Sequence, residues 1–152
     1  MRLTLHTDYS LRLLMLLAIE PDGVHTIATV ASRYGISRNH MMKVAQTLIQ
    51  AGYVESVRGR RGGFKLAKSP AEIVIGQVIR KTEDDLCLTG CFDRDRKDCC
   101  IMIPACGVRK PLQKALTAFF EVLDQYTLAD LLDHPGRVSR MRHILAAAEA
   151  TL

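Results

Sequence analysis

The sequence lacks the features that exported and membrane proteins need. It has no tryptophan, and aromatic residues make up only 5% of its 152 residues. The first residues show neither the apolar stretch nor the small-residue cleavage site of a signal peptide. An apolar run at residues 11–19 includes Arg12 and is much shorter than the roughly 20 residues that cross a bilayer. These absences predict a cytoplasmic protein with no membrane partner.

Signatures of catalysis are also missing. No nucleophile is grouped with a base and an acid, and most of the histidines are scattered singly along the chain. The glycine-rich segment 58–63 lacks the GxxxxGK[ST] order of a phosphate-binding loop. We therefore expect no enzymatic activity. The composition is 48% hydrophobic and 24% charged, which is typical of a globular protein with a real core.

Acidic residues are almost absent from residues 26–68. This segment has eight basic residues and one acid, Glu55, so it carries +7, while the whole chain carries +5 and the remainder −2. Such asymmetry indicates a phosphate-binding surface, with a solvated basic face as the alternative. The local pattern favours the first interpretation.

Two helical patterns within this basic segment are separated by a short break. Apolar residues recur at helical spacing in 27–34 and again in 41–48, with Thr26 and Ser37 as the expected N-caps. Gly35 provides the turn between them. Two short helices joined in this way predict a helix-turn-helix.

The second of these helices would enter a DNA major groove, and a β wing would follow it. Residues 53–57 and 64–66 read as two strands around a tight basic turn, which makes the fold a winged helix-turn-helix. The side chains expected to contact DNA are hydrogen-bonding or cationic. They are Ser37, Arg38, Asn39, His40 and Lys43 on the helix, and Arg58, Arg60 and Arg61 in the wing.

The remaining helices are predicted from caps and apolar stripes. Thr7 is the expected cap of a first helix that is apolar almost all round, which predicts burial on two sides. A helix of about 18 residues around 112–123 carries a wide apolar stripe and is interpreted as a dimerisation helix, with intrachain packing as the alternative. Pro135 and Gly136 are expected to break the chain before a helical or frayed end.

Five cysteines lie in one acidic, irregular loop, with the spacing Cys87-x3-Cys91-x7-Cys99-Cys100-x5-Cys106. Stable disulfides are rare in the reducing compartment expected here. Zinc usually takes CxxC pairs or a nearby histidine, and the loop has neither. An iron–sulfur cluster accepts thiolates on an irregular loop, and a redox thiol switch is the third interpretation. Spacing alone leaves all three open.

Several stretches along nearly the whole chain resemble one superfamily of transcription factors, the one that includes the cluster-assembly regulator IscR. Within it the chain is most similar to nitric-oxide-sensing repressors of the NsrR type. The matching stretches are His6-Thr7-Asp8-Tyr9, Ser37-Arg38-Asn39-His40-Met41, Ala51-Gly52-Tyr53-Val54, Val57-Arg58-Gly59 with Gly62-Gly63, Pro104-Ala105-Cys106, and Tyr126-Thr127-Leu128-Ala129-Asp130-Leu131.

The resemblance implies a homodimer that binds a double-stranded DNA operator and holds an iron–sulfur cluster, [4Fe-4S] or [2Fe-2S], as the sensor of nitric oxide. The cluster ligands that it implies are Cys91, Cys100 and Cys106, with Asp8 of the partner subunit as the fourth. Cys99 is an alternative to Cys100, and Cys87 has no counterpart. The alternative functions are an iron- or cluster-status-responsive regulator of the same superfamily, or a cluster-free zinc or thiol switch.

The expected fold is therefore mainly α with a small β wing. Residues 1–83 would form the winged helix-turn-helix domain and residues 84–106 the cysteine-rich loop. Residues 107–152 would form the dimerisation helix and the C-terminal tail.

Overall fold

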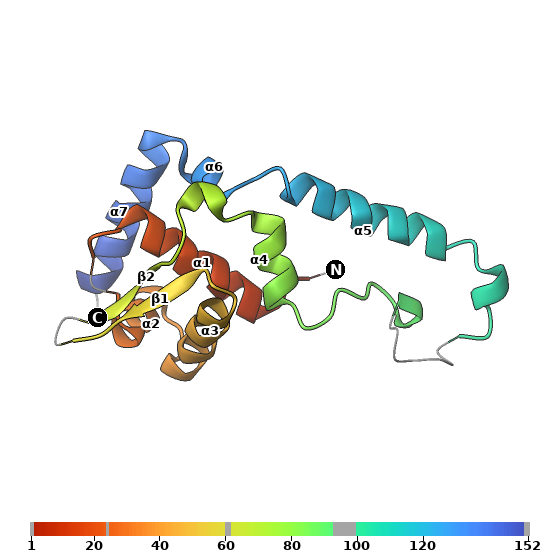
Figure 1. Ribbon diagram of the computed structural model, residues 1–152, viewed down its shortest axis with the longest axis horizontal. Helices are drawn as coiled ribbons and strands as arrows, with labels where there is room; N and C mark the ends of the chain where they lie inside the picture. The colour runs from red at the N-terminus through yellow and green to blue at the C-terminus, as the bar shows by residue number, and fades with distance from the viewer. Residues whose placement is uncertain (1, 24, 60–61, 93–99, 151–152) are drawn as a thin grey trace.

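The computed structural model describes residues 2–23, 25–59, 62–92 and 100–150. Within these ranges the chain is mainly helical with one two-stranded antiparallel sheet, which confirms the predicted fold class (Figure 1). The helices are α1 (Leu5–Ile19), α2 (Ile27–Tyr34), α3 (Arg38–Gln50), α4 (Ile75–Thr82), α5 (Arg109–Leu123), α6 (Leu128–Leu132) and α7 (Pro135–Ala150). The strands are β1 (Val54–Val57) and β2 (Gly63–Leu66), and the 3-10 turns are η1 (Pro70–Glu72), η2 (Gly90–Phe92) and η3 (Ile103–Ala105).

Helix α1 is the central element of the core. It packs against α3 and α4 and also against α6, so elements of the same chain provide the expected burial on two sides. Its leucines form the inner part of the hydrophobic cluster. Those that are fully buried are Leu13, Leu14, Leu16 and Leu17.

The beginning of α1 differs from the sequence prediction. Thr4, rather than Thr7, is the N-cap, and its hydroxyl oxygen accepts the backbone N–H of Thr7 at 3.3 Å. Thr7 lies within the first turn, fully buried, with its hydroxyl 2.9 Å from that of Thr82 in α4. Both threonines are chemically suited to capping, and the contact with α4 decides between them because a buried hydroxyl needs a partner.

The helix-turn-helix forms as predicted, with Thr26 capping α2 and Ser37 capping α3. Gly35 adopts φ 61°, a left-handed conformation that ends α2 at little cost for glycine. The buried side of α3 consists of Met41, Val44, Ala45 and Leu48, which are the apolar positions predicted from the sequence.

The wing is attached to the connection between α1 and α2. Strands β1 and β2 pair in the register Val54↔Leu66 to Val57↔Gly63. His25 extends this pairing, because the Phe64 N–H donates to the His25 carbonyl at 2.9 Å. A Cβ on Gly63 would lie 2.8 Å from the His25 carbonyl oxygen, so the close approach of β2 requires glycine here.

Helix α5 projects away from the other helices and carries the cysteine segment at its far end (Figure 1). It spans 15 residues, fewer than the sequence pattern predicted. Its C-terminal end is held to α4 by two hydrogen bonds from the Arg80 guanidinium to the Asp124 carboxylate, at 2.6 and 2.8 Å. This guanidinium also lies 4.1 Å from the centroid of the Phe120 ring. Arg80 lowers the pKa of the Asp124 carboxyl by donating these hydrogen bonds.

Pro135 and Gly136 do not break the chain as predicted, but begin α7. Proline suits the first turn of a helix, where its missing N–H would have no partner. Helix α7 then folds back onto α2, and its Arg142 donates to the Ile19 carbonyl at the end of α1. No helix in the described part of the chain is long and apolar enough to cross a membrane.

Candidate functional site

The exposed N-terminal end of α3 carries the five residues predicted to meet DNA. Arg38, Asn39, His40 and Lys43 are all exposed, while the apolar side of the helix is buried against the core. Ser37 is exposed too, and its hydroxyl oxygen accepts the His40 backbone N–H at 3.2 Å. The Ser37 hydroxyl proton remains available to an outside acceptor such as a phosphate oxygen. The helix thus presents a cationic, hydrogen-bonding end to its surroundings.

The wing adds a second basic element. Arg58 follows β1 and is exposed, whereas Arg60 and Arg61 lie outside the described residues. Gly59 has φ 123°, a conformation that side chains rarely adopt, so glycine is needed for the chain to turn here. Lys65 of β2 pairs across the sheet with Glu55 of β1, the one acid of the basic segment, with 2.9 Å between Nζ and Oε1.

Helix α1 contacts the recognition helix α3 through side chains that sequence analysis did not single out. The His6 ring Nε2 lies 3.1 Å from the Thr47 hydroxyl, and the ring centroids of Tyr9 and His40 are 6.3 Å apart. A cavity of about 220 Å³ lies between the two helices, lined by these rings and by Lys43. The apolar pattern of α1 gave no signal for these contacts, because they involve its polar and aromatic positions.

Asp8 lies beside this contact and pairs with Arg12 one turn later in α1. The Arg12 Nη2 lies 2.7 Å from Asp8 Oδ2, and the Arg12 Nε donates to Asp8 Oδ1 at 3.2 Å. The Arg12 side chain is 40% exposed and the Asp8 side chain 42%. Arg12 also lies over the Tyr9 ring, 5.7 Å from its centroid. In the single chain the Asp8 carboxylate is therefore paired within its own helix.

The cysteines predicted as ligands are free thiols on the segment between α4 and α5. Cys91 lies in η2, with its Sγ 3.0 Å from the Thr89 hydroxyl, and Cys100 is exposed. Cys106 follows η3 and lines a cavity of about 380 Å³ together with Arg109 and Lys110 at the beginning of α5.

Two further cysteines complete the segment. Cys87 is half-buried, and hydrogen bonds from its side chain and from its backbone N–H to the Asp85 carboxylate lower the pKa of that carboxyl. Cys99, the alternative ligand, lies outside the described residues.

The donor set fits an iron–sulfur cluster in its chemistry, since soft thiolates on an irregular loop are the usual ligands. Among the residues that the structure describes, however, no three His, Cys, Asp or Glu side chains lie close enough together to hold a metal ion. Figure 1 shows that the chain just before α5 lies at the far end of that helix, away from α1. A cluster held by these cysteines would therefore require the described part of the segment to rearrange.

Comparison with known proteins identifies the family. Residues 3–134 match the family model Rrf2, described as an iron-dependent transcriptional regulator. The chain belongs to the Rrf2 family of transcriptional regulators. It is 47% identical over 142 residues to the HTH-type transcriptional regulator NsrR of Bacillus subtilis (strain 168), covering 93% of this chain and 97% of that protein. The NsrR of Halalkalibacterium halodurans is 49% identical over the same length, with 93% and 97% covered.

Solved structures agree with this Rrf2 assignment. "T. potens IscR" has a TM-score of 0.69 and 28% identity, covering 88% of this chain and 87% of that one. CymR of B. subtilis, described as the global cysteine regulator, has a TM-score of 0.69 and 25% identity, covering 86% and 95%. The resemblance found in the sequence is thus confirmed, and so is the expectation of a DNA-binding regulator rather than an enzyme.

Proposed function

We propose that this Rrf2 regulator is a homodimeric repressor that holds an iron–sulfur cluster and releases its operator in response to nitric oxide. The observation that carries the proposal is the position of three free thiols in a chain similar to a named regulator. Three free thiols lie on one segment that α5 carries away from the helix bearing Asp8, in a chain 47% identical to a regulator named NsrR. The proposed ligands are Cys91, Cys100 and Cys106, with Asp8 of the partner subunit.

DNA binding would use the exposed end of α3 and the wing. The recognition helix would lie in a major groove, with Arg38, Asn39 and His40 near base edges and Lys43 near phosphate. Arg58 would reach the backbone or the minor groove beside it. In a two-fold dimer the two recognition helices would read half-sites one helical turn apart, about 34–36 Å.

The exposed apolar surface of α5 supports a dimer. Phe120 near its C-terminal end is buried and the helix packs on α4, but other apolar side chains in and just before α5 remain exposed. Val122 is 54% exposed, and Val108, just before the helix, is 62% exposed. A second copy would cover these side chains, and the two α5 helices would bring each cysteine segment towards the other subunit's α1.

Binding and release of Asp8 would then change the contacts of α1. A cluster held by these cysteines and Asp8 would supply iron that can bind nitric oxide. Asp8 must leave Arg12 to act as a ligand, and a half-exposed ion pair of this kind is worth no more than about 1 kcal/mol. Once free, Asp8 can return to Arg12 in its own helix. Because His6 and Tyr9 connect α1 to α3, this exchange would shift the recognition helix.

The test compares the oxygen-free protein before and after nitric oxide. Iron and sulfide counts and a visible spectrum would measure the cluster. Fluorescence anisotropy would measure binding to a DNA duplex that the protein itself has selected from a random library. Cluster-loaded protein should bind this duplex tightly and lose it after nitric oxide. A colourless protein whose affinity is the same before and after would contradict the proposal.

Variants then test the ligands. Alanine at Cys91, Cys100 or Cys106 should abolish the visible spectrum, whereas Cys87→Ala should keep it. Loss of colour in Cys99→Ala but not in Cys100→Ala would show that Cys99, and not Cys100, is the second cysteine ligand. Asp8→Ala should weaken cluster retention, with Asp22→Ala, an exposed acid, as the matched control.

The description of the matching family as iron-dependent favours one second candidate, a regulator that responds to iron supply. An iron chelator separates the two functions. If the chelator releases the duplex while nitric oxide leaves it bound, the result would support iron sensing. Release by nitric oxide while the chelator has no effect would support the main proposal.

A further inference from the structure

We propose that Arg142 of α7 is a positioning residue for DNA binding and that it acts through the wing rather than through the recognition helix. The inference rests on the proposed function in one respect, namely that the wing contacts DNA. It assigns the C-terminal helix a role in holding the DNA-binding surface in place.

Arg142 supplies a cap to the C-terminal end of α1. Its guanidinium donates to the Ile19 carbonyl oxygen through Nε at 2.9 Å and through Nη2 at 2.5 Å. The last carbonyls of a helix have no partner within the helix, and a cation there also complements the helix dipole. The last turn of α1 has no basic residue of its own, so α7 provides the charge.

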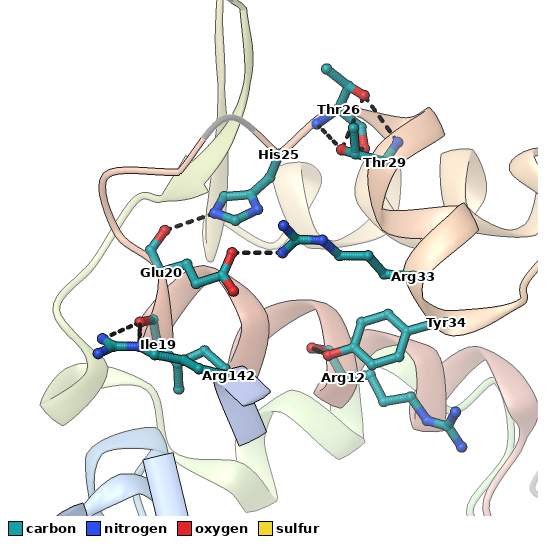
Figure 2. A network of polar contacts seen from close by, with 9 residues as sticks. All are labelled: Arg12, Ile19, Glu20, His25, Thr26, Thr29, Arg33, Tyr34 and Arg142. Carbon is teal, nitrogen blue, oxygen red and sulfur yellow. Dashed lines mark hydrogen bonds and ion pairs between the residues drawn. The ribbon is translucent and has the colours of Figure 1, made fainter. Parts of the chain in front are cut away.

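Figure 2 shows the polar contacts around this carbonyl as far as the His25 ring, and one backbone hydrogen bond connects His25 to the wing. Glu20, the next residue, pairs with Arg33 of α2 at 2.6 Å, and its backbone carbonyl lies 2.7 Å from the His25 ring Nε2. The His25 carbonyl in turn accepts the Phe64 N–H of β2 at 2.9 Å. The end of α1 is therefore connected to α2 and to β2 by neighbouring polar contacts.

The two ends of α1 serve different parts of the DNA-binding surface. Its N-terminal end contacts α3 through His6 and Tyr9, as described above. Its C-terminal end leads through the α1–α2 turn to His25, and the absence of a side chain at Gly63 lets β2 approach His25 closely. Because Arg142 holds the C-terminal end, its loss should move the wing and leave the exposed end of α3 in place.

Arg142→Gln tests the inference, with Arg140→Gln as the matched control on the same helix. Arg142 is largely exposed, so the substitution leaves no core cavity. Arg142→Gln should weaken binding of the selected duplex about five-fold, which corresponds to a loss of 1 kcal/mol. Arg142→Lys, which can still donate to Ile19, should recover part of the affinity, and Arg140→Gln should bind as the unmodified protein does.

Double substitutions identify the route of the effect. If Arg142 acts through the wing, its effect should shrink when Arg58→Ala is already present and remain in full when Arg38→Ala is present. Hydrogen exchange adds a local readout, because the Phe64 amide should exchange faster in Arg142→Gln while amides in the middle of α3 do not change. If Arg142→Gln weakens binding by the same factor in the Arg58→Ala and Arg38→Ala backgrounds, or if amides exchange faster throughout the core, the effect is a general loss of stability. Either result would overturn the inference.

The same experiments separate this inference from the proposed function. If replacing Arg58, Arg60 and Arg61 together by alanine leaves binding of the duplex unchanged, the wing does not contact DNA and the positioning role fails, whereas release of the duplex by nitric oxide still tests the proposed function on its own. If Arg58→Ala weakens binding and Arg142→Gln does not, the proposed function stands and only the positioning role is wrong.

Discussion

Replacing Thr7 with valine removes one hydroxyl from a buried series of hydrogen bonds between α1 and α4. The Thr7 and Thr82 hydroxyls lie 2.9 Å apart, Thr82 donates to the Val78 carbonyl at 3.1 Å, and the Thr4 hydroxyl donates to the Glu83 carboxylate at 3.1 Å. Since each hydroxyl has one proton, Thr7 is the donor to Thr82. Thr82 is the last residue of α4 and Thr7 precedes Asp8, so these bonds hold the Asp8 helix to the beginning of the cysteine segment.

The expected cost follows from what is left behind. Valine has nearly the shape of threonine, so no cavity forms, and Thr82 keeps its donation to Val78. Thr7→Val should therefore cost the net value of one hydrogen bond, about 1 kcal/mol. For a chain of 152 residues this lowers Tm by about 2–4 °C. Thr82→Val should cost more, about 1–3 kcal/mol, because the buried Thr7 donor loses its acceptor.

Urea unfolding of the reduced, metal-free protein, followed by circular dichroism at one fixed protein concentration, measures these differences. The double variant Thr7→Val/Thr82→Val should lower the unfolding free energy by less than the sum of the two single variants, because it leaves no hydroxyl of this pair without its partner. Thr117→Val on the exposed surface of α5 is the control and should change the unfolding free energy by less than about 0.5 kcal/mol. An unchanged free energy in Thr7→Val, or additive costs in the double variant, would refute the reasoning.

Two other predictions concern pH and salt. Burial raises the pKa of Tyr34 from 10.0 to about 12, so the unfolded chain ionises this phenol first and the unfolding free energy should fall as pH rises from about 10 towards about 12. Tyr34→Phe should flatten that decline in urea midpoints measured at several alkaline pH values, and identical slopes in both proteins would contradict the assignment. Lys43→Ala should weaken DNA binding similarly across sequences and lower the slope of log affinity against log salt by about 1 in anisotropy titrations. Lys114→Ala, exposed on α5, should keep the original slope, and an equal drop there would remove the special role of Lys43.

The helix-turn-helix was predictable because its signals are local. Thr26 and Ser37 cap their helices through hydroxyl contacts with backbone N–H groups three residues later, and such contacts depend only on nearby sequence. Gly35 ends α2 for an equally local reason. The spacing of apolar residues in α3 then determines which side chains are buried, and therefore which ones face outward.

Predictions failed where a distant segment chooses between local alternatives. Thr4 and Thr7 are both suited to capping α1, and Thr82, 75 residues away along the chain, takes Thr7 into the core. Pro135 suits the first turn of a helix as well as a break, and packing of α7 onto α2 favours the helix. No local pattern indicated Arg142 as a cap for α1, because its partner Ile19 is 123 residues away.

The candidate site shows the same division. The sequence by itself determined the basic segment, the exposed end of α3 and the collection of cysteines between α4 and α5, since composition and helical periodicity are properties of the chain. Only the tertiary structure decided that α5 projects away from α1 and that α1 meets α3 at His6 and Tyr9. The physical reason is that these relations depend on how whole helices pack, and packing is set by the summed burial of side chains far apart in sequence.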